Sequence, residues 1–310
     1  MRIMLLAAAK KQGASLKPFK TVTKFADMDM GLNGSVVWVN GGLLRILSGQ
    51  RDTNLSDSNL RNYYLTGEFV NKVPMPAPRY ATDIALVNGG DRGYMWGGRY
   101  NGSWGQAGND LTNLNTQTRT ALTWGPSSTA YSNRAISDGG NYIYVIISGT
   151  CELHRFRIDT GARVQLATMP VTGMLGGAVF MHEGDLYHFG GWGGSSLLPN
   201  VYKYSVATNQ WSLYDTIPDG MGSTHQGQGG YADGVFNYMS WKDTVYRAVR
   251  YDVKNKKFVA LDTALGYRNM AGSTFHDGSL YVVGGSTVPL GGGGFGAAAT
   301  NLKSIYKISL

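Results

Sequence analysis

The sequence predicts an all-β protein, a β-propeller of six blades whose last blade is completed by the N-terminal segment. A unit of two apolar runs around a glycine-containing turn recurs six times along the 310 residues, at intervals of 44 to 50. The composition combines 44 glycines and 12% aromatic residues with only 15% charged residues, which suits many tight turns. A repeat of this length with four short strands is typical of propeller blades, so the period decides the fold class.

The six turns share a glycine preceded by asparagine, aspartate, glutamate or another glycine. Glycine, asparagine and aspartate tolerate the positive φ that a tight hairpin requires, so each turn is expected to join two antiparallel strands. The turns are Asn40–Gly42, Asn88–Gly90, Asp138–Gly140, His182–Gly184, Ala232–Gly234 and His276–Gly278.

The strand after each turn is apolar and in three repeats ends in paired glycines, at Gly97–Gly98, Gly190–Gly191 and Gly284–Gly285. The fifth repeat has lost both glycines and reads YMSW, ending at Trp241. Two further strands follow, with large side chains seven residues apart across a polar turn. Tyr204 with Trp211, and Tyr251 with Phe258, are the clear examples, and we expect both pairs to pack between neighbouring blades.

The paired glycines and the spaced aromatic residues resemble the kelch repeat, and the resemblance covers nearly the whole chain. It implies a propeller in which the loops between second and third strands share one face with the loops between blades. A β-sandwich with similar turns is the alternative, but a sandwich needs no fixed period.

The last repeat lacks its outermost strand because the chain ends at Leu310. Near the start, Thr23–Met30 matches the outer strands of other repeats, so Thr21–Asp27 is predicted to pair with Ile305–Leu310 and close the ring. This pairing would remove two open strand edges. Residues 19–310 are then the propeller, and residues 1–18 are a tail or a docking segment.

One face carries the long connections, and this asymmetry predicts that it makes the functional contacts. Its second-to-third loops are expected at Gln50–Asn62, Arg99–Asn113, Trp192–Asn200 and Ser286–Asn301, and a long inter-blade loop at Asp219–Gly230. Aromatic rings with arginine suit a glycan or a protein surface, although the same residues could simply cap blade ends. The candidate binding residues are Arg51, Arg79, Arg99, Tyr100, Trp104, Trp192, His225, Tyr267 and Arg268.

Catalysis, metals and cofactors find little support in the sequence. Seventeen of the 20 acidic residues are aspartates, many of them in turns, no metal-ligand spacing occurs, and Cys151 is the single cysteine. Kelch relatives include copper oxidases, whose ligand set is missing here, and a six-bladed sialic-acid mutarotase. A mutarotase-like enzyme stays the alternative function, since the arginine-rich mouth fits it and the scarcity of glutamate does not.

The net charge of +8 comes from scattered basic residues, so no nucleic-acid partner is expected. No apolar stretch is long enough for a membrane span, and the short apolar start before Lys10 is a poor secretion signal. The glycine-, asparagine- and serine-rich composition resembles bacteriophage tail proteins. We therefore expect a non-enzymatic propeller, in one or several copies, located in the virion or in the cytoplasm before assembly. Its partner would be a host-surface glycan or a neighbouring virion protein.

Overall fold

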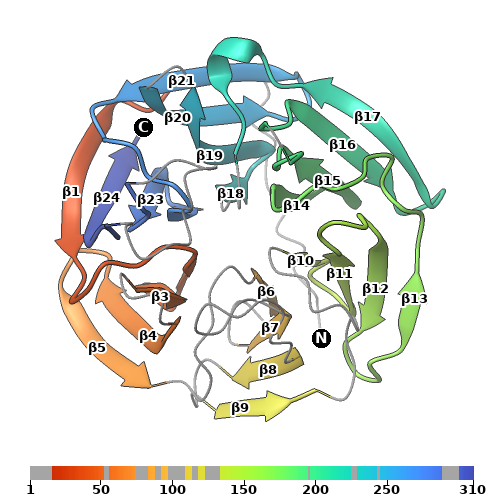
Figure 1. Cartoon of the computed structure of the whole chain (residues 1–310), viewed down its shortest axis with the longest axis horizontal. Coiled ribbons are helices and arrows are strands. Elements are labelled where there is room, and N and C mark those ends of the chain that lie inside the picture. The colour runs from red at the N-terminus through yellow and green to blue at the C-terminus, as the bar shows by residue number, and fades with distance from the viewer. Residues whose placement is uncertain are drawn as a thin grey trace, which may run out of the picture.

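A computed structural model shows an all-β ring of four-stranded sheets (Figure 1). The structure describes residues 16–51, 56–74, 83–87, 92–96, 109–113, 118–122, 133–194, 196–224, 229–242, 245–287 and 300–310. In these ranges, the only helix is the short 3-10 turn η2 (Asp219–Met221), and no helix is long and apolar enough to cross a membrane.

Five sheets are each built from four consecutive strands, and we number them blades 1 to 5. Blade 1 is β2 (Val36–Asn40), β3 (Leu43–Gln50), β4 (Ser56–Tyr64) and β5 (Phe69–Pro74); blade 2 is β6 (Asp83–Val87), β7 (Arg92–Trp96), β8 (Asn109–Asn113) and β9 (Thr118–Ala121); blade 3 is β10 (Arg134–Ser137), β11 (Tyr142–Ile146), β12 (Leu153–Arg157) and β13 (Arg163–Gln165); blade 4 is β14 (Ala178–His182), β15 (Asp185–Phe189), β16 (Asn200–Ser205) and β17 (Gln210–Thr216); blade 5 is β18 (Gly229–Ala232), β19 (Val235–Lys242), β20 (Val245–Asp252) and β21 (Lys257–Thr263).

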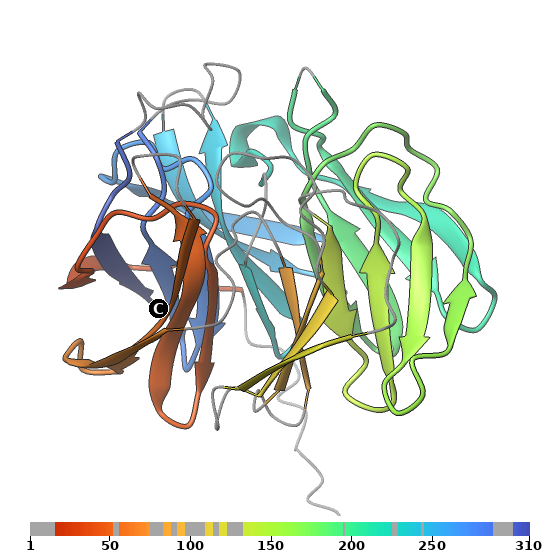
Figure 2. The ribbon, with the colours of Figure 1, turned by 60° about the horizontal axis from the view of Figure 1, so that its bottom comes forward.

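The sixth sheet combines both ends of the described chain, and we call it the composite sheet. Its strands are β22 (Gly272–His276), β23 (Ser279–Val283), β24 (Ser304–Ser309) and, on the outside, β1 (Thr21–Asp27). The first strands of the six sheets, β2, β6, β10, β14, β18 and β22, together line a central cavity of about 300 Å³. The predicted β-propeller is therefore confirmed, and Figure 2 shows its blades from a tilted direction.

Ring closure follows the predicted pairing. β1 runs antiparallel to β24, from Thr21 opposite Ser309 to Asp27 opposite Ser304, and the two strands lie side by side in Figure 1. Just before β1, Phe19 is buried against the composite sheet and blade 5. The Arg250 guanidinium donates a 2.6 Å hydrogen bond to the Lys17 carbonyl oxygen, so contact with the ring begins ahead of the strand.

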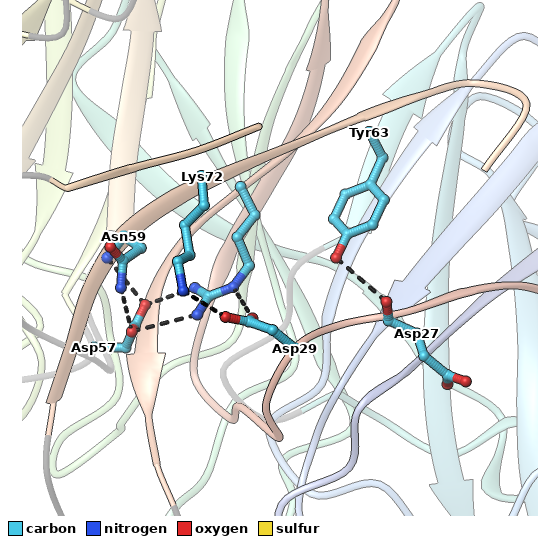
Figure 3. Close-up of polar contacts among 7 residues, drawn as sticks. Asp27, Asp29, Asp57, Asn59, Tyr63 and Lys72 are labelled. Atoms are coloured by element: carbon cyan, nitrogen blue, oxygen red, sulfur yellow. Dashed lines mark hydrogen bonds and ion pairs between the residues drawn. The ribbon is translucent and has the colours of Figure 1, made fainter. Parts of the chain in front are cut away.

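A partly buried ion-pair network forms a second fastening of the ring, which we call the closure latch (Figure 3). Arg61 in β4 is fully buried, and its guanidinium pairs with Asp57 at 2.6 Å and with Asp29 at 2.7 Å. Lys72 in β5 also contacts Asp29, at 2.7 Å. Since Asp29 follows β1, these contacts tie the segment leaving the composite sheet to blade 1.

The strand that carries Asp57 and Arg61 shows that one sequence prediction is wrong. The polar stretch within Gln50–Asn62 was expected to be a long loop, but β4 already begins at Ser56. Asp57 and Arg61 are buried in this strand because each neutralises the other, and Asn59 adds a 2.7 Å hydrogen bond from its side-chain amide to Asp57. Buried charges need such partners, which composition alone does not reveal.

The aromatic pairs of the repeat face each other across the third and fourth strands. Tyr204 lies opposite Trp211 with ring centroids 5.3 Å apart, and Tyr251 lies opposite Phe258 at 4.3 Å. Trp211 is half-buried, and its indole nitrogen donates a 2.7 Å hydrogen bond to Ala167 at the outer edge of blade 3. Such pairs therefore contribute to packing between blades.

The predicted turns join first to second strands wherever they fall in the described chain. Five of them do so, and the sixth, Asn88–Gly90, lies outside the described residues. Three of the five hold a non-glycine residue at positive φ, with Glu183 at 50°, Asp233 at 51° and Asp277 at 44°. The following glycine is also at positive φ in each, which matches the turn chemistry expected from the sequence.

Candidate functional site

Three of the nine predicted binding residues meet in one pocket. Trp192, Tyr267 and Arg268 line it together, whereas Arg51 lies exposed at the end of β3. The remaining five lie outside the described residues and are Arg79, Arg99, Tyr100, Trp104 and His225.

The pocket has a volume of about 220 Å³ and lies between blade 4, blade 5 and the composite sheet. Its walls come from the β15–β16 connection, from the inter-blade connections after β17 and β21, and from β19, β20 and β22. These are the connections that the kelch resemblance places on one face. The described lining residues are Trp192, Leu197, Ser223, Thr224, Met239, Trp241, Tyr246, Tyr267, Arg268, Asn269, Met270, Ala271 and Ser273.

Aromatic rings make up much of the wall. Trp241 meets Tyr267 edge to face, with ring centroids 4.6 Å apart, and lies 6.3 Å from the ring of Tyr246. The buried Tyr246 hydroxyl donates a 3.2 Å hydrogen bond to the Arg268 carbonyl oxygen. This bond holds the connection that carries Tyr267 against blade 5, so the aromatic wall is anchored to the scaffold.

In three other sheets of the ring, a glycine that the structure describes stands at the position that Trp241 occupies, seven residues after the last glycine of the turn. These are Gly49 in blade 1, Gly191 in blade 4 and Gly285 in the composite sheet, whereas blade 3 has Ile147 there. Gly191 N donates to Thr224 O at 3.0 Å and Gly285 N to Leu32 O at 2.8 Å. The backbone of each glycine is therefore hydrogen-bonded directly to the connection that leads into the next sheet. Both glycines have positive φ, and a Cβ at either position would lie 3.0 Å from a side-chain atom of a neighbouring connection, which explains why the repeat favours glycine here.

Blade 5 departs from this arrangement and builds the pocket where it does. The Trp241 side chain lies beside the connection between β21 and β22. The Tyr246 hydroxyl donates the hydrogen bond that the Arg268 carbonyl oxygen of this connection accepts. The lost glycines of the fifth repeat, visible in the sequence, therefore mark the position of the pocket.

Met270 is a second departure from the repeat at the same place. It lies two residues before β22, and the corresponding residues before β14 and β2 are Gly176 and Gly34. All three have positive φ, at 56°, 70° and 62°. A left-handed conformation costs a residue with a side chain about 1–2 kcal/mol, and such strain clusters at functional sites. The buried Met270 side chain lines the pocket despite this cost.

Unsatisfied polar atoms also gather around the pocket. In the described part of the chain, the Ser223 hydroxyl oxygen, Arg268 Nε and Asn269 Nδ2 are buried without a hydrogen-bond partner. All three residues line the pocket and are more than nine-tenths buried. Each buried group without a hydrogen-bond partner destabilises the fold by about 1–3 kcal/mol. A ligand whose atoms accept hydrogen bonds from these three groups would remove this cost.

Arg268 supplies the positive charge of the site. Its Nη1 donates to Gly284 O at 2.8 Å and its Nη2 to the Ser304 hydroxyl at 2.8 Å, and the guanidinium lies over the Tyr306 ring. Burial lowers the pKa of Arg268, but an arginine stays protonated in proteins. Among the described residues no carboxylate pairs with it, so its charge is left uncompensated.

Sequence reasoning missed several residues of the pocket, chiefly Ser223, Trp241, Asn269 and Met270. Trp241 had a visible signal, because it replaces a glycine of the repeat. The other three lie in inter-blade connections, and of these only Met270 stands at a position where other repeats have glycine, at Gly34 and Gly176. Their role depends on how three sheets meet, which a single repeat does not encode.

Comparison with known proteins agrees with the fold. Residues 175–214 match the Kelch motif, a range that spans most of blade 4, where the repeat is clearest. No curated protein matches the chain. The motif and the ring of sheets together support a kelch-repeat β-propeller. Kelch propellers generally mediate protein–protein interactions, so the class is one of recognition scaffolds.

Proposed function

We propose that this propeller is a non-enzymatic recognition protein that binds a glycan through its loop-rich face, with the pocket as the anchor point. The observation that carries the proposal is the pocket itself, where three unpaired buried donors stand beside aromatic rings. Aromatic rings cover the C–H faces of sugars, and donors bind their oxygens. A site concentrated at the two places where the repeat is broken points to function rather than packing.

The lining chemistry favours binding over catalysis. Among the described lining residues none carries a carboxyl or imidazole group, and general acid–base chemistry most often uses these groups. The mutarotase-like alternative would need such a group beside the sugar. The binding reading needs only the donors and rings that are present.

The biological setting of the proposal is attachment of a bacteriophage tail to a host-surface glycan. Its support is the glycine-, asparagine- and serine-rich composition. A neighbouring virion protein is the other partner of the same setting. Both would use the same face, since its connections build the pocket.

A glycan array run beside a sugar-acid mutarotation assay tests the proposal. The wild-type protein should bind a defined set of glycans without changing the anomer ratio of free sugar acids. Trp192→Ala should weaken binding about tenfold or more, as expected for an aromatic anchor. Its thermal melt should stay close to wild type, because the backbone bonds of Trp192 to Leu175 remain.

Leu213→Ala provides the matched control, since Leu213 is 56% exposed on the outer strand β17. It should leave both binding and stability unchanged. Turnover of a sugar acid would overturn the non-enzymatic proposal. Equal binding by wild type and Trp192→Ala would remove the pocket from the recognition surface.

A further inference from the structure

We infer that the pocket takes a carboxylate carried by a single sugar-sized ring, so that the preferred glycan ends in a uronic-acid type of residue. The inference rests on the proposed function and specifies its ligand. It follows from the kind of polar atoms left unpaired, from the charge of the walls and from the volume of the pocket.

The unpaired atoms are matched to an acceptor. Arg268 Nε and Asn269 Nδ2 can only donate, and the Ser223 hydroxyl can donate as well. An ionised carboxylate is an acceptor with two oxygens and no proton, so one group can receive all of these donors. A neutral hydroxyl brings a proton of its own that the described walls must then also satisfy.

The charge of the walls selects the same group. The described lining residues include one cation, Arg268, and no anion. A buried cation without a carboxylate beside it is costly, and a charge-assisted hydrogen bond is about twice as strong as a neutral one. A carboxylate that enters the pocket therefore compensates a charge that the protein leaves open.

The size of the pocket limits how much of the ligand enters. Its volume of about 220 Å³ lies below the roughly 300–1,000 Å³ of pockets that hold whole drug-sized ligands. One ring with its carboxylate is the unit that fits this space. Trp192, Trp241 and Tyr267 would then contact the ring, and the rest of the glycan would extend over the face.

Titration by NMR with small probes tests the inference directly. The probes are glucuronate and galacturonate, each compared with its neutral parent sugar and with its methyl ester. The two acids should bind at least tenfold more tightly than either neutral form, because only they offer a charged acceptor. N-acetylglutamate amide, an acidic peptide fragment without a sugar ring, should bind more weakly than the uronates.

Two conservative variants place the binding in this pocket. Ser223→Ala and Asn269→Ala should each weaken uronate binding severalfold or more while leaving the weak affinity for the neutral sugar unchanged. Neither should lower the thermal melt through a lost bond, since each removes a side-chain group that has an unpaired atom. The control is Ser279→Ala, whose buried hydroxyl bonds Ser309 in the composite sheet and does not line the pocket.

The outcomes separate this inference from the proposed function. Equal affinity for uronates and neutral sugars would refute the inference that the pocket binds a carboxylate. If glycan binding still depends on Trp192, the proposed recognition function would nevertheless stand. Tighter binding of the acidic peptide fragment than of the uronates would refute the inference that the ligand is a sugar, and it would assign the pocket to a protein partner. Uronate binding that is indifferent to Ser223→Ala and Asn269→Ala would place the carboxylate elsewhere.

Discussion

Replacing Arg61 by methionine should unfold the protein at a markedly lower denaturant concentration, because Arg61 and Asp57 form the buried ion pair of the closure latch. The Arg61 side chain is 0% exposed and that of Asp57 is 2% exposed, so the substitution leaves a buried carboxylate without its cation. Breaking a pair of this kind costs about 3–5 kcal/mol. Asn59 still donates to Asp57 through its backbone and side-chain nitrogens, which places the expected loss near about 3 kcal/mol.

Urea unfolding followed by circular dichroism measures this loss, and a double variant tests its cause. Adding Asp57→Asn to Arg61→Met removes the stranded charge and should restore part of the stability. Arg247→Met is the matched control, because its partner Asp262 is 67% exposed and such pairs contribute about 0–1 kcal/mol. A loss below about 1 kcal/mol for Arg61→Met, equal to that of the control, would refute the argument that burial makes the latch strong.

Three further predictions concern the closure and the repeat. Burial alone would raise the pKa of Asp29, but its bonds to Arg61 and Lys72 outweigh burial and lower the pKa to about 2. Its contribution, about 1 kcal/mol because the group is 40% exposed, should be complete above about pH 4 and lost as pH falls toward 2, and melts of Asp29→Asn should lack this step. Gly284→Ala should destabilise by several kcal/mol in urea titrations, because its Cβ would collide with a backbone oxygen. Gly41→Ala, with open space around it, should cost only about 1 kcal/mol for its positive φ. Deleting residues 1–30 should expose the edge of β24 and cause aggregation visible by light scattering, whereas a soluble product with an unchanged melt would contradict ring closure by β1.

The ring and its closure could be predicted because they depend on signals that recur. The turn glycines repeat at regular intervals, and the segment from Thr23 to Met30 matches other outer strands. Each blade buries the same kinds of side chain, so one pattern predicts all of them. The strand at Ser56 was missed for the opposite reason, since its buried charges are satisfied by partners that the local sequence does not show.

The pocket could be predicted only in part. Trp192, Tyr267 and Arg268 were found because large aromatic and basic residues in long connections stand out. Asn269 and Ser223 were not predicted, because a small polar residue indicates a binding site only when its buried side chain lacks a hydrogen-bond partner in the folded protein. That absence depends on the spatial meeting of blade 4, blade 5 and the composite sheet.

The pairing of β1 with β24 sets the order in which this chain can finish folding. β1 leaves the ribosome well before its partner β24, because 276 residues lie between Asp27 and Ser304. At about 5–20 residues per second, the early strand waits roughly 15–55 s for its neighbour. During that interval its edge is open to any other nascent strand. The seven residues of β1 include Lys24 and Asp27, whose charges make such premature pairing unfavourable until the proper partner has been synthesised.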